Sequence, residues 1–197
     1  MIIAKIVKSN SHLDYVARVV DALDAATPPG PEDYGFGQFV ILPVSQTQSI
    51  IGVIYNSLLV NPEYANFGPR LSPAPELHSF SPDYLNEQGQ LVGILLVGMR
   101  ENGQKTLHGV PRRVVPPGQE VREMPPDQVI EFHTDENGSL QIHYYSQVIT
   151  HAGPFAVPLI ESIVEQLSEN ASDDDRNRLN VLKKALAWQR TVGGMRL

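Results

Sequence analysis

Residues 90–99 read Gln-Leu-Val-Gly-Ile-Leu-Leu-Val-Gly-Met, and this stretch decides the fold class. Apolar side chains occupy both of its alternating faces, which is typical of a strand that is buried on two sides or lines a barrel. A helix that spans a bilayer needs about 20 apolar residues, roughly twice the length of this stretch. We therefore expect a central strand here and no membrane-spanning segment in the chain.

Similar but shorter apolar segments precede this strand and predict further strands. These segments are residues 2–7, 15–20, 38–43 and 49–55. They are rich in β-branched side chains, and the chain's 15 glycines and 16 prolines recur between them as turns. The pattern predicts a mainly β fold, a small closed or partly closed β-barrel over residues 1–150, with a long insertion at residues 56–89.

The apolar spacing becomes helical after Gly153 and Pro154. One face of a predicted helix at residues 156–168 carries Leu159, Ile160, Ile163, Val164 and Leu167. We expect this stripe to pack on the chain's own barrel rather than on another chain. The run Ser172-Asp173-Asp174-Asp175 predicts the start of a second helix, because carboxylates are favoured beside exposed N-terminal amides. Residues 151–197 are thus expected to form a C-terminal helical tail, a pair of helices.

Composition and charge limit the classes of function that we expect of this chain. The 197 residues include no cysteine, and the first segment reads as a strand rather than a secretory signal, so a soluble cytoplasmic protein is expected. The 15 basic and 22 acidic residues give a net charge of −7, which opposes a broad contact surface for nucleic acid. No motif implies a cofactor.

A hairpin predicted over residues 129–144 carries a candidate metal site. Alternation places Ile130, Phe132, Leu140, Ile142 and Tyr144 inside, if Gly138 adopts a left-handed conformation in the turn. The outer face then presents Glu131, His133 and His143, which together could supply three ligands to zinc. The alternative is a polar solvent-facing surface, which alternation alone produces, and we expect that alternative here.

Two other motifs resemble catalytic or nucleotide sites without matching them. Residues 98–106 differ by one position from a phosphate-binding loop, because Gln104 separates the second glycine from the lysine and no helix can follow. His12 and Asp14 lie close to Ser9 and Ser11, but the spacing indicates a turn rather than a hydrolase site. We expect neither motif to be functional.

Two sets of residues are candidate contacts with another molecule. The first is a basic cluster that consists of Arg100, Lys105, Arg112 and Arg113. It predicts a surface for an acidic partner, although most such clusters are solvated surface with weak ion pairs. The second lies on the second predicted helix and consists of Leu179, Leu182, Leu186 and Trp188. It predicts contact with a protein partner or with a second copy of the chain.

The first three quarters of the chain resembles the HerA/ATP synthase barrel family. The similar segments are the strands at residues 3–7, 36–42, 51–54 and 91–98 and the proline-rich turn at residues 111–121. The resemblance implies a small barrel that acts as an assembly or docking collar for a ring-forming ATPase. The downstream ATPase domain with its phosphate-binding loop has no counterpart here, so the resemblance implies no catalytic residue.

The sequence therefore favours a non-catalytic interaction or assembly module. The partner is an unidentified protein, such as a ring ATPase, or a second copy of the chain. Two alternatives stay open: a nucleic-acid-associated accessory protein that uses the basic cluster, and a metal-dependent enzyme that uses Glu131, His133 and His143.

Overall fold

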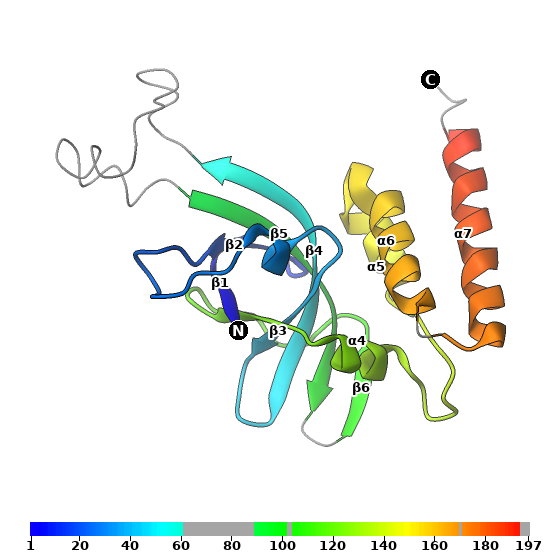
Figure 1. The fold of residues 1–197 in the computed structure, drawn as a ribbon, viewed down its shortest axis with the longest axis horizontal. Helices are drawn as coiled ribbons and strands as arrows, with labels where there is room; N and C mark the ends of the chain where they lie inside the picture. Colours follow the sequence, from blue (N-terminus) through cyan, green and yellow to red (C-terminus); the bar gives the residue numbers. More distant parts are fainter. Residues whose placement is uncertain (61–88, 102–103, 170, 194–197) are drawn as a thin grey trace.

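A closed antiparallel barrel forms the centre of the computed structural model, which describes residues 1–60, 89–101, 104–169 and 171–193. The strands are β1 (Ile2–Ser9), β2 (Asp14–Val19), β3 (Phe39–Pro43), β4 (Gln48–Val60), β5 (Gly89–Glu101), β6 (Gln104–His108) and β7 (Glu120–Glu123). Six strands follow the order β2-β1-β7-β3-β4-β5, the β2–β5 pairing closes the ring, and β6 extends from β5 (Figure 1). The predicted β-barrel is confirmed. Nearly all of the predicted insertion at 56–89 lies outside the described residues.

Strand β5 has the central position that its apolar sequence predicts. One of its edges pairs with β4, from Gln48↔Glu101 to Val60↔Gly89. The other edge pairs first with β2 and then with β6. Residues 94–97 of β5 are completely buried, because the closed barrel covers one side of the strand and helices cover the other.

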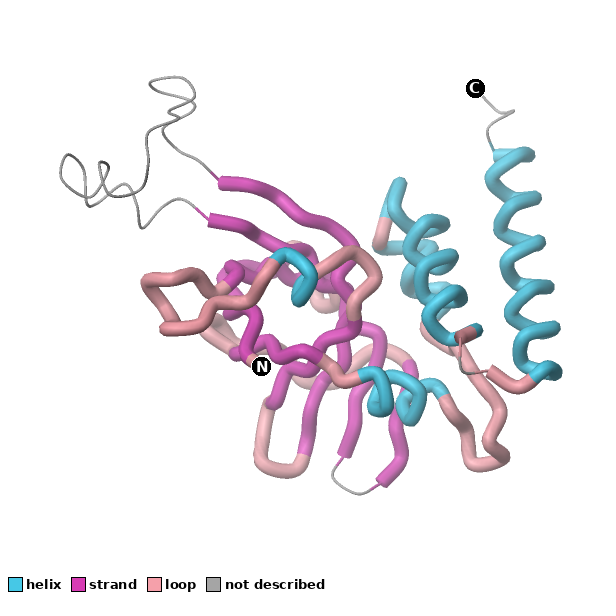
Figure 2. Tube along the Cα trace, in the orientation of Figure 1, coloured by secondary structure: helices cyan, strands magenta, loops and turns pink. Residues whose placement is uncertain are grey.

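The C-terminal part contains more helix than the sequence predicts. Its helices are α4 (Pro126–His133), α5 (Tyr145–His151), α6 (Ala156–Ser168) and α7 (Asp173–Gly193), with a short 3-10 turn η2 (Gly153–Phe155) before α6. The predicted pair corresponds to α6 and α7, and α5, α6 and α7 lie together on one side of the barrel (Figure 2). No helix in the described residues is long and apolar enough to cross a bilayer.

Helix α6 packs on the barrel, as its apolar stripe predicts. Leu159, Ile160, Ile163 and Leu167 are fully buried, and Val164 is nearly so. These side chains belong to the same hydrophobic cluster as the barrel interior. Gly37 supports this contact because it adopts a φ of 82°, and a Cβ atom there would collide with the Ser162 side chain on α6. The barrel and the helical tail therefore share one core.

The hairpin predicted over residues 129–144 is wrong. Residues 126–133 form α4, residues 134–144 form a turn with a single bridge between Thr134 and Leu140, and Tyr145 begins α5. Pro126 occupies the first turn of α4, where its missing amide hydrogen costs nothing. Val129, Phe132 and His133 then share one helical face, and all three are buried. Helical spacing thus explains the burial better than alternation.

The start of α7 is fixed by a reciprocal cap. The Ser172 hydroxyl donates to Asp175 Oδ2 at 2.7 Å and accepts from the Asp175 amide at 3.2 Å. The other carboxylate oxygen of Asp175 accepts from the Leu140 amide at 3.1 Å, which ties α7 to the turn after α4. The predicted N-terminal signal at residues 172–175 is therefore confirmed, and Asp175 also has a tertiary role that the sequence did not reveal.

We expect Asp175→Ala to lower the free energy of unfolding by about 2 kcal/mol, because it removes a helix cap and leaves the Leu140 amide without its acceptor. Asp174→Ala is the matched control, since the Asp174 side chain is 84% exposed and we expect a change below about 0.5 kcal/mol. Urea titration followed by circular dichroism measures both. Equal effects of the two substitutions would contradict the role assigned to Asp175.

Candidate functional site

The segment between β6 and β7 is a long loop held at several points. Pro111 is buried, and its carbonyl oxygen accepts from His12 Nε2 at 2.7 Å. Val115 is also buried, and its amide donates to the Tyr15 hydroxyl at 3.3 Å. Gly118 then donates its amide to the Ile6 carbonyl at 2.7 Å. The loop backbone is therefore fixed against β1 and β2 along most of its length.

The side chains between these anchors face solvent. Val110 is 57% exposed, Val114 is 69% exposed, and Leu107 on the adjoining strand is 47% exposed. Arg112 and Arg113 are exposed as well, and neither forms an ion pair with any residue that the structure describes. We call these five residues, Leu107, Val110, Arg112, Arg113 and Val114, the β6 surface. It combines apolar area with unpaired positive charge on a chain whose net charge is −7.

The predicted basic cluster is only partly present. Arg100 NH2 contacts both carboxylate oxygens of Glu131 at 3.1 and 2.9 Å, and Arg100 also bonds to Gln128, so Arg100 joins β5 to α4. Its charge is therefore already paired inside the chain. The side chain of Lys105 lies outside the described residues. Arg112 and Arg113 are the members of the cluster that form no ion pair within the described part of the chain.

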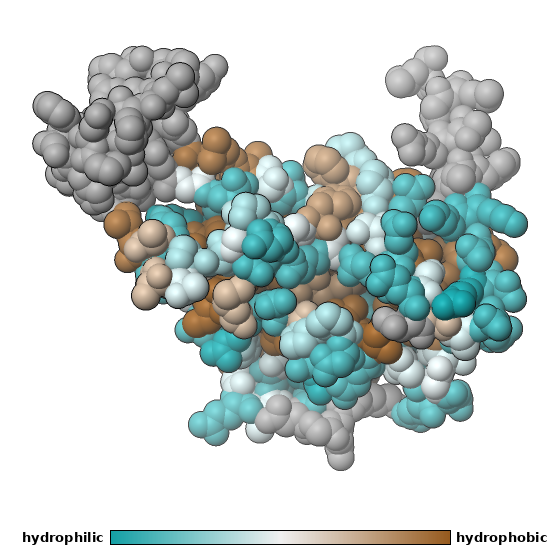
Figure 3. Space-filling view, in the orientation of Figure 1, coloured by the Kyte–Doolittle hydropathy of each residue, from teal (hydrophilic) through white to brown (hydrophobic). Residues whose placement is uncertain are grey.

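The predicted contact stripe on α7 is largely used within the chain. Leu179 is buried in the common core, and Leu182 packs against that core. The outer face of α7 is mainly hydrophilic (Figure 3). The side chains of Leu186 and Trp188 lie outside the described residues. Leu179 is therefore not an exposed contact, because its side chain packs in the core that the helices share with the barrel.

The three candidate metal ligands do not converge. Glu131 is exposed and bonded to Arg100, His133 is fully buried, and the His143 side chain is exposed. The predicted register fails because residues 126–133 are helical, which places Glu131 and His133 on different faces of α4. Among the described residues, no group of three or more histidine, aspartate or glutamate side chains could hold a metal ion. The geometry thus gives no support to the zinc interpretation.

A pair of histidines, the buried His133 and the half-buried His108, joins the barrel to the helices instead. His133 Nδ1 donates to the Val129 carbonyl at 2.7 Å, and its Nε2 accepts from the Tyr144 hydroxyl at 2.6 Å. His108 Nε2 donates to the Phe132 carbonyl at 2.9 Å, and its Nδ1 accepts from the His143 amide at 3.2 Å. Each neutral ring therefore uses one nitrogen as a donor and the other as an acceptor.

Burial favours the neutral form of both rings. It lowers the pKa of His133 to about 3 and the pKa of His108 to about 4. Burial also raises the pKa of the Tyr144 hydroxyl well above its usual range, so that this group stays protonated and donates. All four ring nitrogens have hydrogen-bond partners within the chain, so the pair has a structural role.

The two motifs that resemble nucleotide and hydrolase sites contain residues with structural roles, and residues 102–103 of the first motif lie outside the described residues. Gly98 belongs to β5, where a Cβ atom would lie 2.5 Å from the Leu107 carbonyl oxygen and 2.8 Å from the Phe132 ring. Close packing therefore explains this glycine. The Ser11 hydroxyl accepts from the amides of Leu13 and Asp14, which is a turn geometry. Asp14 accepts from the Tyr55 hydroxyl at 2.8 Å, so its carboxylate does not orient a histidine.

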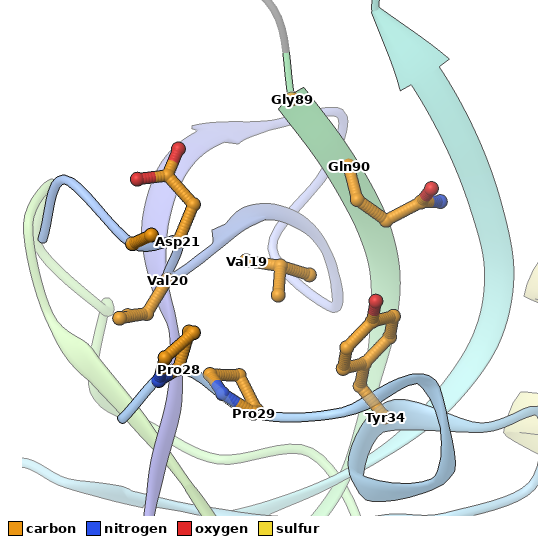
Figure 4. A pocket seen from close by; sticks show the side chains of 9 residues that line it. Val19, Val20, Asp21, Pro28, Pro29, Tyr34, Gly89 and Gln90 are labelled. Carbon is orange, nitrogen blue, oxygen red and sulfur yellow. The ribbon is translucent and has the colours of Figure 1, made fainter. Parts of the chain in front are cut away.

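A small cavity at one end of the barrel was not predicted from the sequence. Its volume is about 220 Å³, and Val19, Pro28, Pro29, Tyr34 and Gln90 are among the side chains around it (Figure 4). Asp21 also lines it, but the Asp21 carboxylate is bonded to Arg18 at 2.6 Å. The cavity is smaller than typical ligand sites, and its acidic group already has a partner.

Comparison with known proteins identifies the family. The family model described as "Domain of unknown function (DUF8166)" matches residues 1–196. The chain belongs to the DUF8166 family. The match covers the barrel and the helices, so the DUF8166 unit includes both parts of the structure. A search of the curated proteins found no match.

Proposed function

We propose that this chain is a non-catalytic interaction module that binds an acidic protein partner through the β6 surface. The observation that carries the proposal is the anchored loop of residues 109–118, which holds Arg112, Arg113 and Val114 in solvent between buried contacts at Pro111 and Val115. A loop that is already ordered loses little conformational entropy when a partner binds. Arginine is also enriched at protein interfaces relative to the rest of the protein surface.

The charge distribution favours an acidic partner. Arg112 and Arg113 present two unpaired positive charges, whereas the chain as a whole carries −7. A negatively charged partner would be attracted to this loop and repelled by most of the remaining surface, which orients the encounter. The resemblance to the HerA/ATP synthase barrels supports an assembly role and makes a ring ATPase one candidate partner.

A nucleic-acid-associated role is the second candidate, because Arg112 and Arg113 could also contact phosphates. Arg100 is paired with Glu131 and Arg122 with Glu120, so among the side chains that the structure describes these two arginines already have acidic partners. Tight binding to nucleic acid rests on several phosphate contacts. The apolar side chains of Leu107, Val110 and Val114 have no role in such contacts, and we therefore favour a protein partner.

The proposal predicts that Arg112→Glu together with Arg113→Glu weakens the complex with the natural partner at least tenfold, on the order of 1.4 kcal/mol or more. The partner is recovered from native lysate, identified by mass spectrometry and then measured by calorimetry with the purified chain. Lys183→Glu together with Lys184→Glu is the matched control, because both residues are exposed on α7 and the change in net charge is the same. Retained affinity in the arginine double variant would contradict the proposal.

A further inference from the structure

Strand β6 lies outside the closed ring and has one unpaired edge. It pairs with β5 through Gly98↔His108, Met99↔Leu107 and Arg100↔Thr106. It stands last in the strand order, and within the described residues no other strand pairs with it. The barrel closes through β2 and β5 without it. The outer edge of β6 therefore presents strand backbone that the fold itself does not use.

The direction of these free backbone groups follows from the ladder. The Gly109 amide donates to the Val97 carbonyl at 3.0 Å, which makes this pair a hydrogen-bonded one. Hydrogen-bonded and non-bonded pairs alternate along an antiparallel ladder. Leu107 is thus bonded to β5, whereas the backbone groups of Thr106 and His108 point away from β5. No backbone partner for these groups is found in the part of the chain that the structure describes.

We propose that β6 binds an extended acidic segment of the partner protein as an added strand, an inference that rests on the proposed function. Backbone groups of Thr106 and His108 would pair with the incoming segment, and alternate side chains on one face of that segment would meet Leu107. Arg112 and Arg113 lie in the loop that follows β6, four and five residues after His108, and would pair with carboxylates of that segment.

The charges argue against a second copy of this chain as the added strand. Symmetric pairing of β6 with itself would bring Arg112 and Arg113 of both copies to one shared sheet edge. Like charges across paired strands are destabilising, and positive charge near an open edge is a common defence against self-association. The same residues attract an acidic strand. The free edge and the nearby positive charges therefore favour an acidic strand over a second copy of this chain.

Hydrogen exchange of individual amides tests this binding mode without a substitution. Two synthetic peptides of about nine residues serve as probes, one that alternates glutamate with valine and one with proline at its central position. The expected result is at least tenfold slower exchange of the Thr106 and His108 amides with the first peptide, little change with the second, and loss of the effect as salt is raised from about 0.15 M to 0.5 M. Equal binding of both peptides, or no protection by either, would overturn the proposal.

A pair of variants separates this inference from the proposed function. Thr106→Pro removes an outward amide hydrogen without removing a bond to β5, and Thr106→Val keeps that amide. We expect capture of the natural partner to fall at least tenfold with Thr106→Pro and to stay unchanged with Thr106→Val. Unchanged capture by Thr106→Pro, together with loss of capture by the arginine double variant, would overturn strand addition and leave the proposed function intact. Loss of neither would overturn both.

Discussion

At pH 5 the free energy of unfolding is expected to be about 3 kcal/mol lower than at pH 7, because His108 and His133 are neutral in the folded protein. Their folded pKa values of about 4 and about 3 lie below the value of 6.5 for an unperturbed histidine. Below pH 6.5 the unfolded chain therefore binds protons at these two histidines that the folded chain does not bind. Stability contributed by the neutral rings is complete above that pH and is lost progressively as pH falls toward 4 and 3.

The two histidines contribute unequally to this expected loss. One pH unit corresponds to about 1.4 kcal/mol per group, so the fully buried His133 accounts for about 2 kcal/mol between pH 7 and pH 5. His108 is only partly buried and solvent screens it, so we assign it about 1 kcal/mol. Carboxylates titrate mainly below this range and add little to the loss.

Urea titrations at pH 7 and pH 5 measure the effect directly. His133→Gln is expected to be less stable at pH 7 and to lose about 2 kcal/mol less than the natural chain between the two values. His151→Gln is the control, because His151 is exposed at the end of α5, and its pH dependence should match that of the natural chain. NMR of the imidazole nitrogens at pH 5 gives a second readout, and a protonated His133 in the folded protein would refute the assignment.

Phe132→Ala is expected to lower the free energy of unfolding by about 3–5 kcal/mol, which is the largest effect we expect of any single substitution discussed for this chain. Phe132 is fully buried. The distance from its ring centroid to the ring centroid of His108 is 4.3 Å, to that of Phe39 6.4 Å and to that of Tyr144 6.2 Å. The side chain thus fills the space between β5, β6, α4 and the start of α5. Removal of the ring leaves a cavity between these elements, and its cost adds to the loss of buried apolar area.

The matched control for this prediction is Phe155→Ala. Phe155 also contacts another aromatic ring, that of Phe36 at 6.1 Å, but it is 39% exposed. We expect its substitution to cost about 1 kcal/mol. Thermal and urea unfolding of both variants provide the comparison. Similar losses for the two would mean that Phe132 does not join the barrel to the helices in the way that its contacts indicate.

The barrel could be predicted from the sequence because its strands carry a clear pattern. Apolar runs with β-branched residues, separated by glycine and proline, predicted β1 to β5, with bounds that differ by at most five residues from those of the structure. The stripe on α6 was equally clear, because a helix that packs on a core needs apolar residues at helical spacing. The closing pair β2–β5 could not be predicted, since pairing between distant strands leaves no mark in local sequence.

Residues 126–144 were mispredicted because their apolar residues fit both the alternation of a strand and the spacing of a helix. Ile130 and Phe132 alternate with polar residues, but Val129, Phe132 and His133 also share a helical face. The deciding residue is His133, which is completely buried and satisfied by Val129 and Tyr144. A buried polar residue contradicts the usual inside-outside pattern, and nothing in local sequence reveals that its partners exist. Pro126 and Asp127 were helix-start signals that deserved more weight.

The candidate site was predictable in its charges but not in its geometry. Arg112 and Arg113 were identified from sequence because they stand together in a proline-bounded segment. The pairing of Arg100 with Glu131 was not predictable, since it requires α4 to lie beside β5. The anchoring of the loop through His12 and Tyr15 joins residues about a hundred positions apart, and such contacts follow from the closed barrel alone.

The position of β7 has a consequence for synthesis on the ribosome. This four-residue strand lies between β1 and β3, through pairs such as Lys5↔Glu120 and Ile41↔Arg122. The first two hairpins can form as soon as they are translated, but their facing edges have no neighbour until residue 123 has left the exit tunnel. A nascent chain of this protein therefore exposes two strand edges for most of its elongation, and those edges are where chaperones would act or where premature chains would aggregate.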